Sequence, residues 1–535
     1  MLKQSQPFEM PAQSPDLPLS ERLARVGVWA LCLGVLARNL GPLKEGDEWM
    51  HLSIGRWMLN HSQLLPTPDP LVWNDRGGDL QHEWLSQILL AGTDALAGLM
   101  GLRLLRGILL ALCAWLVAKI LHRASQNWPT ALAGVSLWWL VAQPHAAIRP
   151  HLFGWLFALL VLGLLQQIPQ WNKKHWFLYT FLLLLWAQAH SSQIVAPLFL
   201  GLHTLDLLVT ERRLDRQWTA RTLIAGLVVP LQPCGFALLP YALRSPQVAQ
   251  GLVDEWAPTW QADVWQVQPW VPITLILLLF LTLLAALPRF GPLDRPFPNL
   301  LPALLAAIEM LHTRRMTFFA WIPLTFLAPR SPVRLPAWAA LVLALAVWLT
   351  VGRTAEVWPQ KNYVPGNFPV EITPFLARTP LQGKLFNPDP WGGWLEYWLP
   401  PRELHAGPLP STDGRMLMAG RQWALDSLQI QAHGPDAEKL LETHEISVLL
   451  QRRADWLQVR PLNPQQFALA WQDRTAVLLV HQDRFFAQNV QSICQFYRQN
   501  PEQKSHATWP VRLQAPAGQA SPTDVPSVLE LCAKE

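Results

Sequence analysis

Apolar runs separated by short polar breaks fill the first two-thirds of the chain. Runs that could cross a membrane begin at about residues 24, 103, 130, 151, 176, 194, 219, 270, 297, 316 and 336. Counted with its flanks, each comes close to the roughly 17 residues that a spanning helix needs. The pattern predicts an all-α polytopic membrane domain of about eleven transmembrane helices over residues 24–352. The polar tail before it, residues 1–23, lacks the apolar core of a signal peptide.

Basic residues fall in every second break between the apolar runs. They are Arg22 and Arg25, Lys119 and Arg123, Lys173 and Lys174, Arg212, Arg213, Arg216 and Arg221, Arg289 and Arg295, and Arg330 and Arg334. Because Lys and Arg are retained on the cytoplasmic side, we predict a cytoplasmic N-terminus and an extracytoplasmic C-terminus. This assignment requires residues 83–101, which carry Ser86, Gln87 and Asp94, to lie along the outer membrane surface without crossing it.

The last third of the chain has a different pattern, with shorter apolar stretches. ISVLL at 446–450 and TAVLLVH at 475–481 are typical of strands, and helical pieces and Pro- or Gly-marked turns surround them. We predict a soluble domain of mixed α and β structure (an α/β, or α+β, domain) outside the membrane over residues 353–535. Cys494 and Cys532 lie there, and the sequence allows either a disulfide in an oxidising compartment or two separate thiols.

The composition agrees with a membrane protein, since 51% of the residues are hydrophobic and only 15% are charged. A net charge of +5 could suggest nucleic-acid binding, but the basic residues lie in the breaks between apolar runs. We therefore predict no nucleic-acid partner. The predicted location is a bacterial inner membrane, with membrane lipids as partners and the C-terminal domain in the periplasm.

The first outward connection, residues 41–102, is rich in acids. From residue 41 to residue 83 it has seven acids against three bases. Asp75 and Asp79 lie in the turn-like NDRGGD, where an outward loop tolerates acids freely. Asp47 instead lies between the first apolar run and WMHLSIGRWML, whose apolar face suits the membrane surface. A carboxylate half shielded from water at such a place can have a tuned pKa and act as a base or metal ligand.

GDEW at 46–49 and HEWLSQILLAG at 82–92 resemble the two acidic motifs of the GT-C superfamily of lipid-dependent membrane glycosyltransferases. This superfamily includes protein O-mannosyltransferases and aminoarabinose transferases. The resemblance implies that Asp47 is the catalytic base or metal partner, with Glu48 beside it, and that Glu83 is its acidic helper. Trp84 and Leu85 follow Glu83 where characterised families have Lys-Pro or Pro, which leaves the role of Glu83 open.

The chain is also similar to a group of uncharacterised bacterial membrane proteins with GT-C-like domains, and this similarity covers most of its length. It rests on DEWMHLSIGRWMLNHSQLLPTPDPLVW, IRPHLFGW, HTRRMTFFA, LFNPDPWGGWLEYWLP and the DGR at 413–415. We interpret PDPWGGWLEYW at 388–398 as a turn into a strand of the outer domain, with part of an acceptor site as the alternative.

A polyprenyl-phosphate sugar donor would need cations at the outward ends of the helices. Arg149, Arg314 and Arg315 lie in outward connections, against the usual charge bias, and we predict that they bind the donor phosphate. Arg149 could instead reach lipid headgroups or pair with the loop acids. Further substrate contacts are predicted at outward histidines, although a lone histidine is more often a packing residue. These are His51, His82, His151 and His190.

The predicted function is sugar transfer from a polyprenyl-phosphate donor to an unidentified acceptor hydroxyl, by inverting single displacement with Asp47 as base. Mg²⁺ or Mn²⁺ held by Asp47 could assist the departing phosphate, and otherwise no cofactor is expected. The alternative is a non-catalytic GT-C-like scaffold that binds partner proteins through residues 353–535. Transport is disfavoured because the charged candidates cluster at outward ends and not at mid-membrane.

Overall fold

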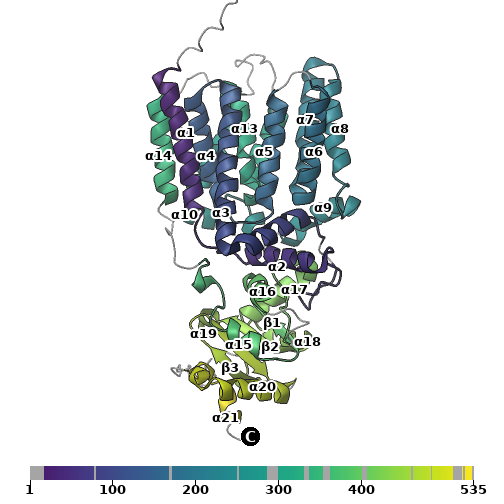
Figure 1. Ribbon diagram of the computed structural model, residues 1–535, viewed down its shortest axis with the longest axis vertical. Coiled ribbons are helices and arrows are strands. Elements are labelled where there is room, and N and C mark those ends of the chain that lie inside the picture. The colour runs from purple at the N-terminus through teal and green to yellow at the C-terminus, as the bar shows by residue number, and fades with distance from the viewer. Residues whose placement is uncertain are drawn as a thin grey trace, which may run out of the picture.

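A helical bundle forms one end of the molecule, and a smaller part with a sheet forms the other (Figure 1). The computed structural model describes residues 17–77, 80–167, 171–249, 252, 254–285, 299–330, 336–352, 362–399, 407–458, 462–482, 485–509, 521 and 524–532. Several predicted features lie outside these residues. They are the first 16 residues of the polar tail, Asp79, and the basic residues Arg289, Arg295 and Arg334.

The bundle has a helix at each place where the hydrophobic pattern predicts a span. These are α1 (Leu19–Arg38), α3 (Trp84–Ser125), α4 (Trp128–Ala142), α5 (His151–Gln167), α6 (Lys173–Ala189), α7 (Val195–Glu211), α8 (Arg216–Val228), α11 (Trp270–Ala285), α12 (Leu300–His312), α13 (Trp321–Leu327) and α14 (Ala337–Gly352). Two of the described helical stretches, Trp84–Ser125 and Ser191–Glu211, are long and apolar enough to cross a membrane by themselves. The mainly helical fold is confirmed, while the count of eleven spans stays a prediction.

Helix α3 changes direction at Gly98, whose φ of +61° and ψ of −167° interrupt the helix. Glycine adopts this backbone conformation without a steric penalty from a Cβ atom. Figure 1 shows α2 (Gly46–His61) and the first part of α3 lying across the end of the bundle that faces the C-terminal part. The break supplies the turn that residues 83–101 need if they follow the membrane surface.

Short helices connect the bundle at the same end. They are η1 (Gln143–His145), η2 (Ser191–Ile194), η3 (Gly235–Ala237), α9 (Leu238–Ala249), η4 (Asp254–Trp256), α10 (Ala262–Val267) and η6 (Arg314–Ala320). The polar residues of the site described below come largely from these connections and from α2.

The segment 388–398 forms helix α16 (Asp389–Trp398), so its interpretation as a turn into a strand is wrong. Trp391, Trp394 and Leu395 are spaced as on one face of a helix, and all three are buried. The two glycines between the aromatics do not mark a turn here. They allow close packing on neighbouring backbone.

Helices α2 and α16 approach each other backbone to backbone. A Cβ atom on Gly393 would lie 2.5 Å from the amide nitrogen of Met50 and 2.6 Å from the carbonyl oxygen of Gly46. Trp49 of α2 packs edge-on against Trp394, with ring centroids 4.8 Å apart. The start of α2 is therefore fixed by the C-terminal part as well as by the bundle.

The C-terminal part contains a four-stranded sheet in the order β1-β2-β4-β3. Its strands are β1 (Lys384–Phe386), β2 (Ile446–Arg452), β3 (Phe467–Gln472) and β4 (Ala476–His481), with β1 parallel to β2 and the other pairs antiparallel. Its other helices are α15 (Thr373–Arg378), α17 (Met416–Gln431), α18 (Ala437–Thr443), α19 (Arg453–Gln458), α20 (Phe486–Gln499) and α21 (Val528–Cys532). The strands predicted at 446–450 and 475–481 are confirmed. Of the two alternatives for the cysteines, the structure has the disulfide, Cys494 to Cys532, which joins α20 to α21.

Candidate functional site

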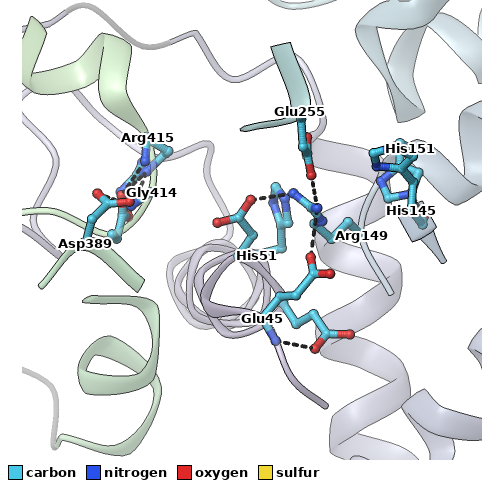
Figure 2. A network of polar contacts seen from close by, with 12 residues as sticks. Glu45, His51, His145, Arg149, His151, Glu255, Asp389, Gly414 and Arg415 are labelled. Carbon is cyan, nitrogen blue, oxygen red and sulfur yellow. Dashed lines mark hydrogen bonds and ion pairs between the residues drawn. The ribbon is translucent and has the colours of Figure 1, made fainter. Parts of the chain in front are cut away.

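One arginine gathers three carboxylates at the end of the bundle that faces the C-terminal part. Arg149, in the turn between η1 and α5, pairs with Asp47 at 2.6 Å, with Glu45 at 2.7 Å, and with Glu255 of η4. Figure 2 shows Arg149 between Glu45 and Glu255. The side chain of Arg149 is 13% exposed, whereas those of Asp47 and Glu45 are 36% and 38% exposed. A single positive charge is thus shared by three acids, two of which are open to solvent.

The proton affinities of these acids differ. Burial raises the pKa of Asp47, although Arg149 opposes the rise. Burial likewise raises the pKa of Glu45 to about 7. For Glu255 burial acts in the same direction, but Arg149 and Arg315 outweigh it and hold the pKa below its usual range. Asp47 is thus able to accept a proton while Glu255 stays ionised.

The three arginines predicted to bind a phosphate have different surroundings. Arg149 is paired with acids of the first connection, which is the alternative named for it from the sequence. Arg314 of η6 pairs with Asp263 at 2.8 Å. Arg315 is exposed, lies over the ring of Trp256 at 5.1 Å, and makes no ion pair with any residue that the structure describes. Of the three, Arg315 is the one whose charge is available to a bound anion.

Glu48 is fully occupied by contacts with the protein. Its side chain is 1% exposed and accepts hydrogen bonds from the amides of Lys44 at 2.7 Å and Ile148 at 3.0 Å. It also pairs with Arg106 at 3.5 Å. As the third residue of a capping box with Glu45, it fixes the first turn of α2 and the turn before α5. These contacts make Glu48 a residue that holds Asp47 in place.

Glu83, at the start of α3, lies among three of the predicted histidines. His190 is 3.1 Å from its carboxylate, His82 is 3.5 Å away and His51 of α2 is 3.8 Å away. Burial raises the pKa of Glu83, but His82 and His190 outweigh it and hold the pKa well below the usual value. The fourth histidine, His151 at the start of α5, has Nε2 2.8 Å from the backbone carbonyl oxygen of His145 in η1. Glu83 is therefore a poorer proton acceptor than Asp47.

The C-terminal part reaches this site through α16 and the loop after residue 411. Asp389 at the start of α16 accepts hydrogen bonds at Oδ1 from Thr412 Oγ1, at 2.8 Å, and from the amide of Gly414, at 3.1 Å. Gly414 has a φ of +101°, and a Cβ atom there would lie 2.6 Å from Oδ1 of Asp47. A residue of the C-terminal part thus lies beside the predicted base. In Figure 2, Asp389, Gly414 and Arg415 lie on one side of His51 and Arg149 lies on the other.

Sequence signals existed for the residues that the prediction missed. Asp389 lies in the NPDPWGGWLEYW segment, and Gly414 is the centre of the DGR. Glu255 stands in a second Asp-Glu-Trp, at 254–256, that repeats the one at 47–49. The repetition of this tripeptide in a second connection between apolar runs is the signal that could have identified Glu255.

The donor set around Asp47 does not fit Mg²⁺ or Mn²⁺. These ions need several oxygen ligands. Oδ2 of Asp47 is bound by the guanidinium of Arg149, which leaves Asp47 a single oxygen for a metal. Within the described ranges, no three side chains of His, Cys, Asp or Glu are arranged to hold a metal ion. We therefore derive no step that involves a metal.

No family model and no curated protein matches the chain. Among solved structures, it is similar to the Archaeoglobus fulgidus oligosaccharyltransferase tethered with an acceptor peptide, with 11% identity, a TM-score of 0.49, and coverage of 80% of this chain and 69% of that chain. The same enzyme in complex with Zn and sulfate matches with 12% identity, a TM-score of 0.47, and coverage of 85% and 73%. ArnT from Cupriavidus metallidurans bound to undecaprenyl phosphate matches with 14% identity, a TM-score of 0.37, and coverage of 85% and 97%. Each of these TM-scores is below 0.5, so the matches are similarities alone, and the GT-C resemblance rests on the sequence motifs quoted above.

Proposed function

We propose that the chain is a membrane glycosyltransferase that moves a sugar from a polyprenyl-phosphate-linked donor to an acceptor hydroxyl. The observation that carries the proposal is the presence in one site of a proton-accepting carboxylate, Asp47, and an exposed guanidinium without an ion-pair partner among the described residues, Arg315. Transfer from a lipid phosphate needs a base for the acceptor and a cation for the leaving group. Both stand at the end of a largely apolar bundle, where a lipid-borne donor would present its phosphate.

The reaction would be a single displacement. Asp47 takes the proton of the acceptor hydroxyl while the hydroxyl oxygen forms a bond to the anomeric carbon. The bond from that carbon to the phosphate oxygen breaks, its electron pair leaves with the lipid phosphate, and the anomeric configuration inverts. Arg149 orients the Asp47 carboxylate without neutralising it, because Glu45 and Glu255 share the same positive charge.

Arg315 would stabilise the departing phosphate. A guanidinium can make two parallel hydrogen bonds to phosphate oxygens. The ring of Trp256 beneath it restricts the orientations that the guanidinium can adopt. Asp47 and Arg315 would thus give the site a base for the acceptor and a cation for the donor phosphate.

The predicted topology belongs to the same proposal. The N-terminus would be cytoplasmic, and the C-terminal part and the site would face the periplasm across a bacterial inner membrane. The alternation of basic residues between apolar runs supports this orientation.

The test is an assay of the purified full chain in lipid nanodiscs with a panel of polyprenyl-phosphate-linked hexoses and pentoses. The expected result is release of polyprenyl phosphate from at least one donor, with water or an added alcohol as acceptor. No release from any donor, together with stable co-purification of other membrane subunits, would contradict the enzyme and favour the scaffold.

A further inference from the structure

Gly414 lies beside two carboxylates that come from different parts of the chain. One point, the position of a Cβ atom on Gly414, lies 2.6 Å from Oδ1 of Asp47 and 3.9 Å from Oδ2 of Asp389. Asp47 belongs to α2, whereas Asp389 opens α16, more than 300 residues later in the chain. The two acids therefore face each other across one glycine.

Each of these carboxylates has one oxygen engaged and one oxygen available. Oδ2 of Asp47 is held by Arg149, and Oδ1 of Asp389 is held by Thr412 and the Gly414 amide. The other two oxygens accept no hydrogen bond from the described residues, and both lie on the side of Gly414 where a Cβ atom would stand. Both side chains are partly exposed.

Several features hold this arrangement in place. The φ of +101° at Gly414 strains any residue with a side chain, and a Cβ atom there would displace the Asp47 carboxylate. A Cβ atom on Gly392 would collide with the backbone of Thr412 and Asp413, so the loop can approach α16 only at a glycine. The fold thus uses two glycines to bring Asp389 beside the proposed base.

We infer that Asp389 binds the acceptor together with Asp47, so that the C-terminal part completes the reacting site. This inference rests on the proposed function. Oδ2 of Asp389 accepts a hydrogen bond from the acceptor next to the hydroxyl that Asp47 deprotonates, and water takes the same place when no acceptor is bound. Burial raises the pKa of Asp389 to about 6, so near neutral pH it is chiefly a charged acceptor of hydrogen bonds.

The inference names a class of acceptor. Two adjacent carboxylates attract the hydrogen of an uncharged hydroxyl and repel a neighbouring anion. The acceptor is therefore expected to present uncharged hydroxyl groups to this side of the site, while the anionic partner, the lipid phosphate, stays near Arg315.

The experiment compares two probe acceptors, octyl glucoside and its anionic analogue octyl glucuronide, with the full chain in nanodiscs. Release of polyprenyl phosphate is the readout. In Asp389→Asn the KM for octyl glucoside should rise by about tenfold, the loss expected for one hydrogen bond to a charged group. The KM for the donor should not change, the preference for the uncharged probe should fall, and release with water alone should slow.

Two further variants separate the roles. Gly414→Ala should lower kcat by displacing Asp47, with less change in the acceptor KM. Glu445→Gln removes an exposed carboxylate of the same part of the chain, which is 62% exposed and pairs with Lys384, and should behave like the wild type.

Unchanged release on water and an unchanged octyl glucoside KM in folded Asp389→Asn would overturn the inference. If that variant does not fold, Asp389→Glu keeps the charge and moves it, and the same two unchanged readouts would be equally decisive. A wild-type protein that releases nothing from any donor would instead overturn the proposed function itself, and that outcome involves no variant.

Discussion

Two arginines in this molecule collect carboxylates, and they differ mainly in access to solvent. Arg149 pairs with acids whose side chains are 24% to 38% exposed. Arg415 of the DGR segment pairs with Asp69 at 2.6 Å and with Asp413 through Nε at 2.8 Å. The side chains of Asp69 and Asp413 are 4% and 0% exposed. The same residue types thus form an open cluster in one place and a sealed one in another.

The difference in exposure indicates a structural role for the cluster around Arg415 and a chemical role for the cluster around Arg149. The sealed cluster joins the first connection, through Asp69, to the C-terminal part, through Arg415, and its side chains are at most 8% exposed. The open cluster keeps an oxygen of Asp47 available while Arg149 fixes the other. We therefore expect changes at Asp47 to affect rate, and changes at Arg415 to affect stability.

The largest effect is expected from Asp47→Asn. It removes the base while preserving the shape of the side chain, and a positioned base contributes about 10²- to 10⁴-fold. Release of polyprenyl phosphate should fall by that factor with an unchanged melting temperature. Asp75→Asn, in the same connection, is the matched control. Near-normal turnover in Asp47→Asn would contradict the proposed mechanism.

Replacing a residue of the sealed cluster should lower the free energy of unfolding. Arg415→Met leaves Asp69 and Asp413 buried without their cation, and loss of one partner of a buried ion pair typically costs about 3–5 kcal/mol. Chemical denaturation in detergent micelles should show this loss. A loss below about 1 kcal/mol is typical of solvent-exposed salt bridges. Such a result would contradict the distinction drawn between the sealed cluster and the open one.

The availability of Arg315 can be tested by Arg315→Gln. Removing a charged hydrogen-bond donor to the phosphate should raise the donor KM by roughly tenfold. Arg213→Gln is the control, since Arg213 is 74% exposed and pairs only with a nearby acid, Glu211, among the described residues. Equal donor KM values in the two variants would indicate that the phosphate binds elsewhere.

The smallest effect concerns pH. Burial raises the pKa of Asp69 to about 6 even though Arg415 opposes the rise. A carboxyl with a raised pKa in the folded state contributes its full stability below the unfolded value, near 4, and loses it as the pH rises through about 6. Asp69→Asn imitates the protonated form. Above pH 6 its free energy of unfolding should therefore exceed that of the wild type by on the order of 1 kcal/mol. Melting curves of both proteins from pH 4 to pH 8 measure the difference. If Asp69→Asn becomes less stable than the wild type as the pH rises, Arg415 has a larger effect on the pKa of Asp69 than burial has.

Much of the fold was predictable because hydrophobic periodicity is a local property. The apolar runs located the bundle helices, and short apolar stretches typical of strands located β2 and β4. The segment at 388–398 was misjudged because its glycines were taken as a turn signal. Only the neighbouring backbone of α2 and of the loop after residue 411 shows that they allow close packing in a helix.

The site was predicted less completely, for a different physical reason. Asp47 stood out because of its place beside an apolar run, and Arg315 because it lies against the usual charge bias. The pairing of Arg149 with three acids, and the approach of Asp389, depend on contacts between segments separated by 100 or more residues. A spacing rule cannot supply such contacts.

The glycine contact between α2 and α16 has a consequence for inhibition of the protein. No hinge separates the first turn of α2 from the C-terminal part, because Gly46 and Gly393 place the two backbones against each other. An antibody fragment that wedged α16 away from α2 would carry Gly414 away from Asp47 as well. Under the proposed function, such a binder would inhibit transfer by separating two helices, without entering the polar site or competing with the lipid donor.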